Sequence, residues 1–177
     1  MRRIKRVILA VSVIAAGLIL FAYALPRVVS ASRSITIAAS PAEIYPYLDS
    51  LQAFHEWSPW TERDPDMVVK FSGPDQGVGN RMEWVSDQDD VGTGSQEIIA
   101  AVPDERVETA LDFGPMGTAD AAWLLRPVDT GTEVEWTFST DLGLNPVWRY
   151  MGLMMEGWVG ADYEKGLQSL KSRVEGS

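Results

Sequence analysis

The chain has 177 residues, a formal net charge of −10, a single histidine and no cysteine. Its length suits one globular domain with one additional segment. The lack of cysteine excludes disulfides and thiolate metal sites, and His55 alone cannot build a histidine metal cluster. No P-loop, GxGxxG, HExxH or GxSxG motif occurs either. We therefore expect no metal and no cofactor.

The charge is divided unevenly along the chain. Five of the 15 basic residues, and none of the 25 acidic ones, lie within residues 1–27. Residues 28–177 thus carry ten basic against 25 acidic residues, a net charge of −15. A domain this acidic repels the phosphate backbone of a nucleic acid, so we expect no nucleic-acid partner.

Residues 7–25 form an uncharged apolar run of 19 residues, about the length that a helix needs to cross a bilayer. Four basic residues precede the run, and positive charges hold that side of a span in the cytoplasm. We predict that residues 1–27 are a cytoplasmic basic segment and a single-pass anchor in the inner (cytoplasmic) membrane. Residues 28–177 would then form a domain on the periplasmic or extracytoplasmic side.

A cleaved signal peptide is the rival interpretation, because Ala22-Tyr23-Ala24 resembles a small-x-small cleavage site. We favour the anchor, since the apolar run is longer than the roughly 7–15 residues of the apolar core (h-region) of a signal peptide. A buried core helix is disfavoured because the run has no polar face. Pro26 and Arg27 end the predicted span, and residues 28–34 are expected to be a short tether.

The domain begins with a predicted strand over residues 33–39 (RSITIAA), where the two isoleucines share one face. Residues 40–43 (SPAE) are typical of a capped helix start. That helix is expected to kink or to end early at Pro46. An aromatic break over residues 54–60 (FHEWSPW) follows.

Short apolar segments separated by turn signals predict six more strands. Two of them alternate cleanly between apolar and polar side chains, which indicates an antiparallel sheet with one dry and one wet face. Met82, Trp84 and Trp123 fall on the dry face by the same count. The predicted strands cover residues 67–71, 80–85, 93–102, 106–113, 118–128 and 132–140.

The last predicted element is a long helix over residues 145–174, where apolar residues recur at steps of three and four. Only this helix can cover the dry face of the sheet. A helix packed on one face of an antiparallel sheet is an α+β fold. Gly152, Gly157 and Gly160 weaken the helix by about 1 kcal/mol each relative to alanine. They indicate a break near Gly157, a close approach of helix to sheet, or a gate for a ligand, and the sequence leaves all three open.

Several motifs in this order resemble the SRPBCC superfamily, also called START-like or Bet v 1-like. They are residues 57–60 (WSPW), 77–79 (GVG), 131–136 (GTEVEW) and 162–167 (DYEKGL). Over about residues 33–173 the chain resembles the polyketide cyclase/dehydrase and lipid-transport branch in its membrane-anchored bacterial form. The resemblance implies a helix-grip fold, in which a strongly bent seven-stranded antiparallel sheet wraps around the C-terminal helix and encloses a pocket for a hydrophobic ligand. Family members include lipid carriers, hormone receptors and aromatase/cyclases, so the fold alone does not assign an activity.

Aromatic and methionine side chains are the candidate ligand-binding residues, because broad apolar walls with few polar groups suit an apolar ligand. Ordinary core packing is the alternative for each of them. The ligand interpretation is best for the tryptophans at which sheet and helix should meet, at positions 84, 123, 136 and 158. The predicted set is Trp57, Trp60, Met82, Trp84, Phe113, Trp123, Trp136, Met154 and Trp158.

His55 and Glu56, beside the aromatic break, would be the natural acid–base pair for a cyclase or dehydrase. Adjacent residues cannot both point inward, and a lone loop histidine is more often a solvated surface residue, so we assign no catalytic residue. Glu83 and Asp120 are expected on the wet face. The loop carboxylates at positions 64, 66, 87, 89 and 90 lack the spacing of an EF-hand and are interpreted as solvated.

Three functions are compatible with this sequence. We prefer membrane-tethered binding or transport of a hydrophobic small molecule, such as a lipid, isoprenoid or polyketide-like compound, in an internal cavity. One alternative is an aromatase/cyclase- or dehydrase-like enzyme, with His55 or a buried tyrosine (Tyr45, Tyr47 or Tyr163) as the proton donor. The other is a ligand-free interaction or stress-response domain with a filled core. The size of the space between helix and sheet distinguishes them.

Overall fold

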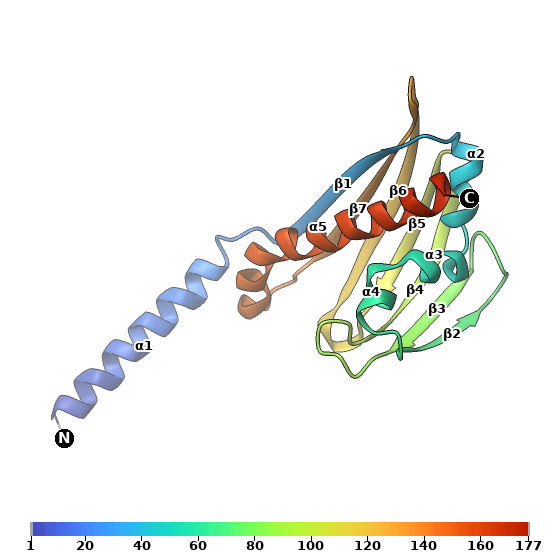
Figure 1. Ribbon diagram of the computed structural model, residues 1–177. Helices are drawn as coiled ribbons and strands as arrows, with labels where there is room; N and C mark the ends of the chain where they lie inside the picture. The colour runs from blue at the N-terminus through green and yellow to red at the C-terminus, as the bar shows by residue number, and fades with distance from the viewer. Residues whose placement is uncertain (1, 177) are drawn as a thin grey trace.

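The computed structural model of the protein describes residues 2–176, so that Met1 of the predicted anchor segment and Ser177 of the predicted domain lie outside the described residues. An N-terminal helix leads into a seven-stranded sheet, with short helices between the first two strands and a long helix at the end (Figure 1). The elements are α1 (Arg2–Ala22), β1 (Val28–Ile37), α2 (Pro41–Ile44), η1 (Tyr45–Tyr47), α3 (Leu51–Trp57), α4 (Pro59–Arg63), β2 (Val68–Ser72), β3 (Arg81–Val85), β4 (Thr93–Val102), β5 (Arg106–Asp112), η2 (Gly114–Met116), β6 (Thr118–Val128), β7 (Gly131–Asp141) and α5 (Pro146–Glu175).

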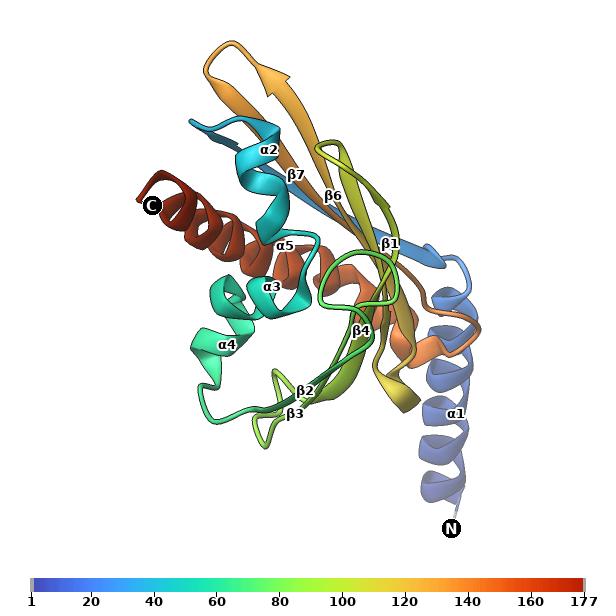
Figure 2. The same cartoon turned by 90° about the vertical axis from the view of Figure 1, so that its right-hand side faces the viewer.

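The strands form one antiparallel sheet in the order β1-β7-β6-β5-β4-β3-β2, with β1 and β2 at its edges. Val28 at the start of β1 pairs with Asp141 at the end of β7, and the end of β5 pairs with the start of β6. These strand ends, together with the end of β3 and the start of β4, share one end of the sheet. We call it the α1 end, because β1 follows α1 directly. The sheet curls around α5, which confirms the α+β helix-grip fold (Figures 1 and 2).

The first strand begins at Val28, five residues earlier than predicted. The expected tether over residues 28–34 was therefore wrong, since residues 28–32 pair with residues 137–141 of β7. The backbone of β7 continues to Asp141, and its free edge offers hydrogen bonds to an extended neighbour. Serines alternate with small apolar residues in this segment, which made an edge strand resemble a polar linker in the sequence.

The segment after β1 is interrupted as Pro46 predicts. The backbone N–H of Ser40 donates to Glu43 Oε2 at 2.8 Å and caps α2, which ends one residue before the η1 turn around Pro46. The expected aromatic break was wrong, because most of residues 54–60 are helical in α3 and α4. Ser58 separates these two helices and accepts a hydrogen bond from the backbone N–H of Trp60 at 3.3 Å. A serine that can cap a new helix thus divides the segment without a long loop.

The C-terminal helix is continuous from Pro146 to Glu175, so a break near Gly157 was the wrong alternative. Asn145 caps the helix, with its Oδ1 accepting the N–H of Val147 at 2.9 Å. A Cβ atom at Gly152 would lie 2.5 Å from Leu142, and one at Gly160 would collide with the guanidinium of Arg33 on β1. The close approach of helix to sheet was the correct alternative for these two glycines.

The core fills the half of the interior that lies away from the α1 end. Trp57, Trp123 and Trp136 are all at most 1% exposed. The rings of Trp123 and Trp136 lie 5.4 Å apart, and the ring of Phe54 packs 5.3 Å from the first and 5.8 Å from the second. The ring of Tyr163 stacks on Trp136 at 3.8 Å. This aromatic cluster joins α3, β6, β7 and α5, and it closes the interior on that side.

Within the described residues, one helix is long and apolar enough to cross a membrane. It covers Arg3–Ala22, with a mean hydropathy of 2.3, and none of that window is buried in the domain. Such a helix could be a membrane span or a signal sequence. Figure 1 shows α1 projecting away from the domain beside the start of α5.

Candidate ligand cavity

A cavity of about 610 Å³ lies between α5 and the sheet, on the side of the aromatic cluster that faces the α1 end. Its walls come from α3, α4, the inner faces of β3, β4, β5 and β7, and α5 as far as Tyr163. Three loops of the α1 end complete it: residues 89–92, 113–118 and 141–145. The interior is therefore not filled, whereas the ligand-free alternative required a filled core.

Five of the nine predicted ligand-binding residues line this cavity: Trp60, Met82, Trp84, Phe113 and Trp158. They come from α4, β3, the turn after β5 and α5, which lie far apart in the sequence. The rings of Trp84 and Phe113 meet edge to face at 6.0 Å and form one wall. Trp84 is 7% exposed, whereas Trp158 is 52% exposed and stands at the edge of the cavity.

The other four predicted residues do not line the cavity. Trp57, Trp123 and Trp136 belong to the buried aromatic cluster behind it, so that a contact with a ligand is not supported for them. Met154 is 48% exposed on the outside of α5. Each residue turns the helix by about 100°, which places Met155 in the cavity wall and turns Met154 away from it. The apolar stripe read from the sequence was wider than the face that meets the sheet.

The predicted ligand-binding set omitted several cavity residues, although Tyr163 was named as a possible proton donor. Trp148, Met155, Val159 and Tyr163 follow each other on α5 at steps of seven, four and four, and all four line the cavity. This spacing was the signal for a narrower stripe within the predicted one. The loop residues 142–145 gave no such signal, because only the turn from β7 into α5 brings them to the cavity.

Polar groups in the cavity wall are few and come from separate elements. Gln96 is 4% exposed, and its amide nitrogen donates to Thr109 Oγ1 at 3.0 Å. Tyr163 is 2% exposed, and within residues 2–176 its hydroxyl makes no hydrogen bond. Burial raises the pKa of Tyr163 well above its ordinary value, so the phenol stays protonated. The Tyr163 hydroxyl is thus available to donate to a polar group of a ligand.

His55 lies in α3 and lines the cavity, in contrast to the solvated loop position that we considered more common. Its Nδ1 lies 2.8 Å from Thr61 Oγ1. Burial lowers the pKa of His55 below its ordinary value, which favours the neutral imidazole. Glu56 points away and pairs with Arg173, so the two adjacent residues do not face the same space.

Arg63 joins three elements at the side of the cavity. Its guanidinium pairs with Asp162 of α5, and its Nε lies 3.3 Å from Asp90 Oδ2 in the β3–β4 loop. Ser86 at the start of the same loop donates to Asp64, which follows α4. The loop is thus attached to α4 at two points, and Arg63 pairs with one carboxylate of the loop and one of α5.

The loop carboxylates do not form a metal site. Among residues 2–176, no group of three or more histidine, aspartate or glutamate side chains is arranged to hold a metal ion. Asp64 and Asp90 are engaged with Ser86 and Arg63 as described above.

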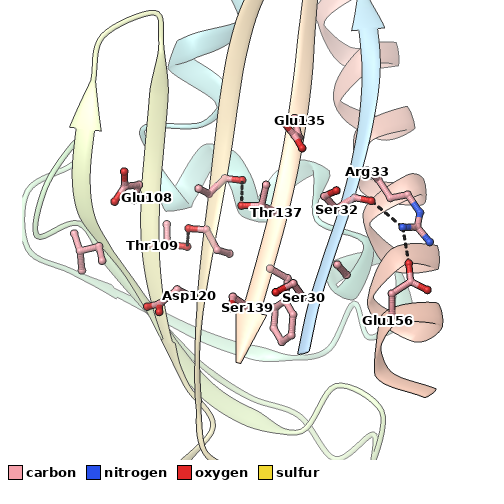
Figure 3. Close-up of a pocket in the computed structure, with 15 residues that line it drawn as sticks. Ser30, Ser32, Arg33, Glu108, Thr109, Asp120, Glu135, Thr137, Ser139 and Glu156 are labelled. Carbon is pink, nitrogen blue, oxygen red and sulfur yellow. Dashed lines mark hydrogen bonds and ion pairs between the residues drawn. The ribbon is translucent and has the colours of Figure 1, made fainter. Parts of the chain in front are cut away.

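A second hollow, of about 900 Å³, crosses the outer face of β5, β6, β7 and β1 (Figure 3). Its polar side chains include Glu108, Asp120 and Glu135, which agrees with the wet face expected for Asp120. Arg33 reaches from β1 past this hollow to Glu156 of α5, at 2.9 Å. The hollow is an open, polar depression of a sheet surface, whereas ligand sites are typically apolar and concave. The inner cavity is therefore the candidate site.

A family model described as "Polyketide cyclase / dehydrase and lipid transport" matches residues 28–175. No curated protein matches the chain. Among solved structures, the di-domain ARO/CYC StfQ from the steffimycin biosynthetic pathway is similar with a TM-score of 0.63 and 14% identity. The match covers 84% of this chain and 51% of StfQ, so this chain spans about half of that protein.

Two further structures have the same fold over nearly their whole length. SA2116 from Staphylococcus aureus, a protein of unknown function, has a TM-score of 0.63 and 11% identity, over 84% of this chain and 94% of SA2116. Ara h 8.0201 has a TM-score of 0.58 and 13% identity, over 85% of this chain and 99% of that protein. At these identities the similarity shows the fold alone.

Proposed function

The chain belongs to the polyketide cyclase/dehydrase and lipid-transport family, and on this premise we propose that it binds a hydrophobic small molecule in the cavity between α5 and the sheet. We further propose that α1 is retained as a single-pass anchor in the inner membrane, with residues 1–27 as the anchor segment and residues 28–177 as an extracytoplasmic ligand-binding domain. The protein would bind or carry its ligand next to the bilayer in which that ligand dissolves.

The single observation that carries the proposal is the composition of the cavity wall. Four tryptophans (Trp60, Trp84, Trp148 and Trp158) converge there with methionines and aliphatic side chains around about 610 Å³ of space. A volume of this order, with mostly apolar walls and few polar groups, is typical of small-molecule sites. Methionine side chains adapt to ligands of varied shape, which suits a carrier of flexible apolar molecules.

The few polar groups narrow the class of ligand. The Tyr163 hydroxyl can donate a hydrogen bond, and the Gln96 amide lies in the same cavity. The carboxylate of Asp162 is held by Arg63 and does not offer a free charge to the ligand. A largely hydrocarbon molecule with one carbonyl, hydroxyl or carboxyl group, such as a lipid, isoprenoid or polyketide-like compound, matches this wall.

Photocrosslinking tests ligand binding directly. Cells that express the full chain are fed a photoreactive fatty acid, irradiated, and the crosslinked peptides are mapped by mass spectrometry. We expect labels on cavity peptides from β3, β5 and α5. Val159→Trp should abolish this labelling by filling the cavity, whereas the matched variant Leu153→Trp, on an exposed position of the same helix, should not. Labelling confined to α1, or equal labelling of both variants, would refute the cavity as the ligand site.

An enzyme of the cyclase or dehydrase kind is the second candidate, and the position of His55 favours it. A neutral imidazole in the cavity wall, with Nδ1 held by Thr61, leaves Nε2 free to exchange a proton with a bound substrate. His55→Gln keeps the size and polarity of the side chain but cannot exchange the proton. Unchanged turnover of a test polyketide in this variant would remove His55 from any mechanism.

A further inference from the structure

The three loops that complete the cavity lie at the α1 end of the sheet. They join β3 to β4, β5 to β6, and β7 to α5. β1 begins at the same end, opposite Asp141, and only residues 23–27 separate it from α1. The turns from β2 to β3, from β4 to β5 and from β6 to β7 lie at the opposite end. Figure 2 shows the β5–β6 turn and the start of α5 on the side of the domain to which α1 extends. The loop side of the cavity thus faces the direction in which α1 leaves the domain.

The rim of the cavity exposes large apolar side chains on this side. Met116 in the β5–β6 turn is 56% exposed, Leu144 before α5 is 71% exposed, and Val147 in the first turn of α5 is 65% exposed. Met116 and Leu144 also line the cavity, so apolar surface continues from the rim to the interior. Exposed apolar clusters of this kind mark surfaces that bind something.

Contacts between α1 and α5 fix the position of this rim along the axis of α1. The hydroxyl of Tyr150 donates to the backbone carbonyl of Leu18 at 2.7 Å, and the rings of Tyr150 and Phe21 lie 6.5 Å apart. The guanidinium of Arg149 donates to the backbone carbonyl of Leu25 at 2.8 Å. Leu18 lies four residues, about 6 Å, before the end of α1. The first turns of α5 are thus level with the last turn of the apolar helix, and in a spanning helix that level is the membrane interface, where tyrosine is enriched.

We propose that the rim of Met116, Leu144 and Val147 docks onto the bilayer that α1 crosses, so that the cavity opens directly to the lipid. This inference rests on the proposed function, because it takes α1 as an intact anchor. A ligand could then pass between bilayer and cavity without crossing water.

The docking surface attracts lipid through apolar contact and not through charge. Asp87 and Asp89 lie in the β3–β4 loop at the same end of the sheet, and their negative charges would repel anionic headgroups. The nearby cations are already engaged, since Arg27 pairs with Asp141 and Arg63 with Asp162. Arg149 is 7% exposed and donates to the backbone carbonyls of Leu25 and Gly143. Basic residues close to the surface are what draws a protein to anionic lipid. The occupant is therefore the apolar and zwitterionic part of the bilayer.

Site-specific fluorescence quenching tests the docking in the full chain. The chain contains no cysteine, so a single introduced cysteine can carry one small fluorophore. Met116→Cys and Val147→Cys report the rim. Val78→Cys is the matched control, because Val78 is a similarly exposed valine (59%) in the β2–β3 loop at the opposite end. Leu9→Cys reports α1 itself. Each labelled protein is reconstituted in phosphatidylcholine vesicles with and without a nitroxide-labelled lipid.

We expect the nitroxide lipid to quench the labels at Leu9, Met116 and Val147 and to leave the label at Val78 unquenched. Quenching at Leu9 but not at Met116 or Val147 would overturn the docking while leaving the anchor in place. No quenching at Leu9 would show that α1 is not an anchor, and the proposed tether would then fail together with the docking. Replacing half of the lipid with phosphatidylglycerol should not increase quenching at Met116, and a clear increase would overturn the assignment of an uncharged occupant.

Discussion

Two glycines of α5 should respond in opposite ways to the same substitution. Gly157 is exposed, and among residues 2–176 nothing lies within 4 Å of a Cβ built there. Gly166 is buried, and a Cβ there would lie 2.7 Å from Cζ3 of Trp136 and 3.1 Å from Cδ of Pro59. Both of these neighbours are rigid rings, and Trp136 is itself held by stacking on Tyr163.

The magnitudes follow from these environments. Gly157→Ala should raise the free energy of unfolding by about 0.5–1 kcal/mol, because alanine loses less backbone freedom than glycine in a helix. Gly166→Ala gains the same helix stabilisation, but its methyl group must displace a packed ring. Overpacking of this kind lowers the free energy of unfolding by about 1–3 kcal/mol. We therefore expect Gly166→Ala to be less stable than Gly157→Ala by about 1–3 kcal/mol, or by roughly 2–12 °C in melting temperature for a domain of this size.

Thermal unfolding of the full chain in one detergent, followed by circular dichroism, measures this difference. The wild-type chain and the two variants share the same anchor, so its contribution cancels. Equal stabilisation by both substitutions would refute the close approach of α5 to the sheet at Gly166, and with it the tight packing of Trp136 on Tyr163 behind the cavity.

Three further predictions concern the cavity. The pKa of His55 is lowered by burial, so the folded protein binds fewer protons than the unfolded chain just below the ordinary pKa of 6.5. Stability should be fully present above that pH and should fall as the pH drops below it, and His55→Gln should remove this part of the pH profile in denaturant titrations. Tyr163→Phe removes a hydroxyl without a partner in the described chain, so we expect a change of at most about 0.5 kcal/mol in stability. The same substitution should lower the affinity for a carbonyl-bearing ligand by about 2- to 10-fold in fluorescence titrations, and it should leave the affinity for a pure hydrocarbon unchanged. Arg63→Gln breaks the pairs with Asp162 and Asp90, whose partial exposure limits the loss to about 1 kcal/mol in thermal melts, and high salt should reduce the difference from the wild type.

The periodic elements could be predicted from the sequence because their patterns are local. β6 was predicted with its observed limits, and α5 to within one residue at each end. The start of β1 could not be predicted, because Val28 is in a strand only through its pairing with Asp141, more than a hundred residues away. An edge strand such as the start of β1 is extended because it pairs with a neighbouring strand, and the local sequence does not show that pairing.

The candidate site was predicted only in part, for a geometric reason. Trp84 and Trp136 both belong to the dry face of the sheet, yet Trp84 lines the cavity and Trp136 packs in the core. The two differ in their distance from the α1 end, which depends on how α3 and α5 cross the sheet. The loop residue Leu144 lines the cavity only because β7 turns back into α5 there.

Composition and spacing alone determined that this chain has an apolar N-terminal segment, an acidic domain without cysteine, and a sheet covered by one amphipathic helix. Each of these follows from short-range patterns of apolar and charged residues. Tertiary structure alone decided that the interior is hollow on one side, that His55 and Tyr163 line that hollow, and that its loops lie at the end of the sheet where β1 follows α1. A cavity arises where packed elements fail to fill the space between them, and that mismatch depends on the positions of all the elements together.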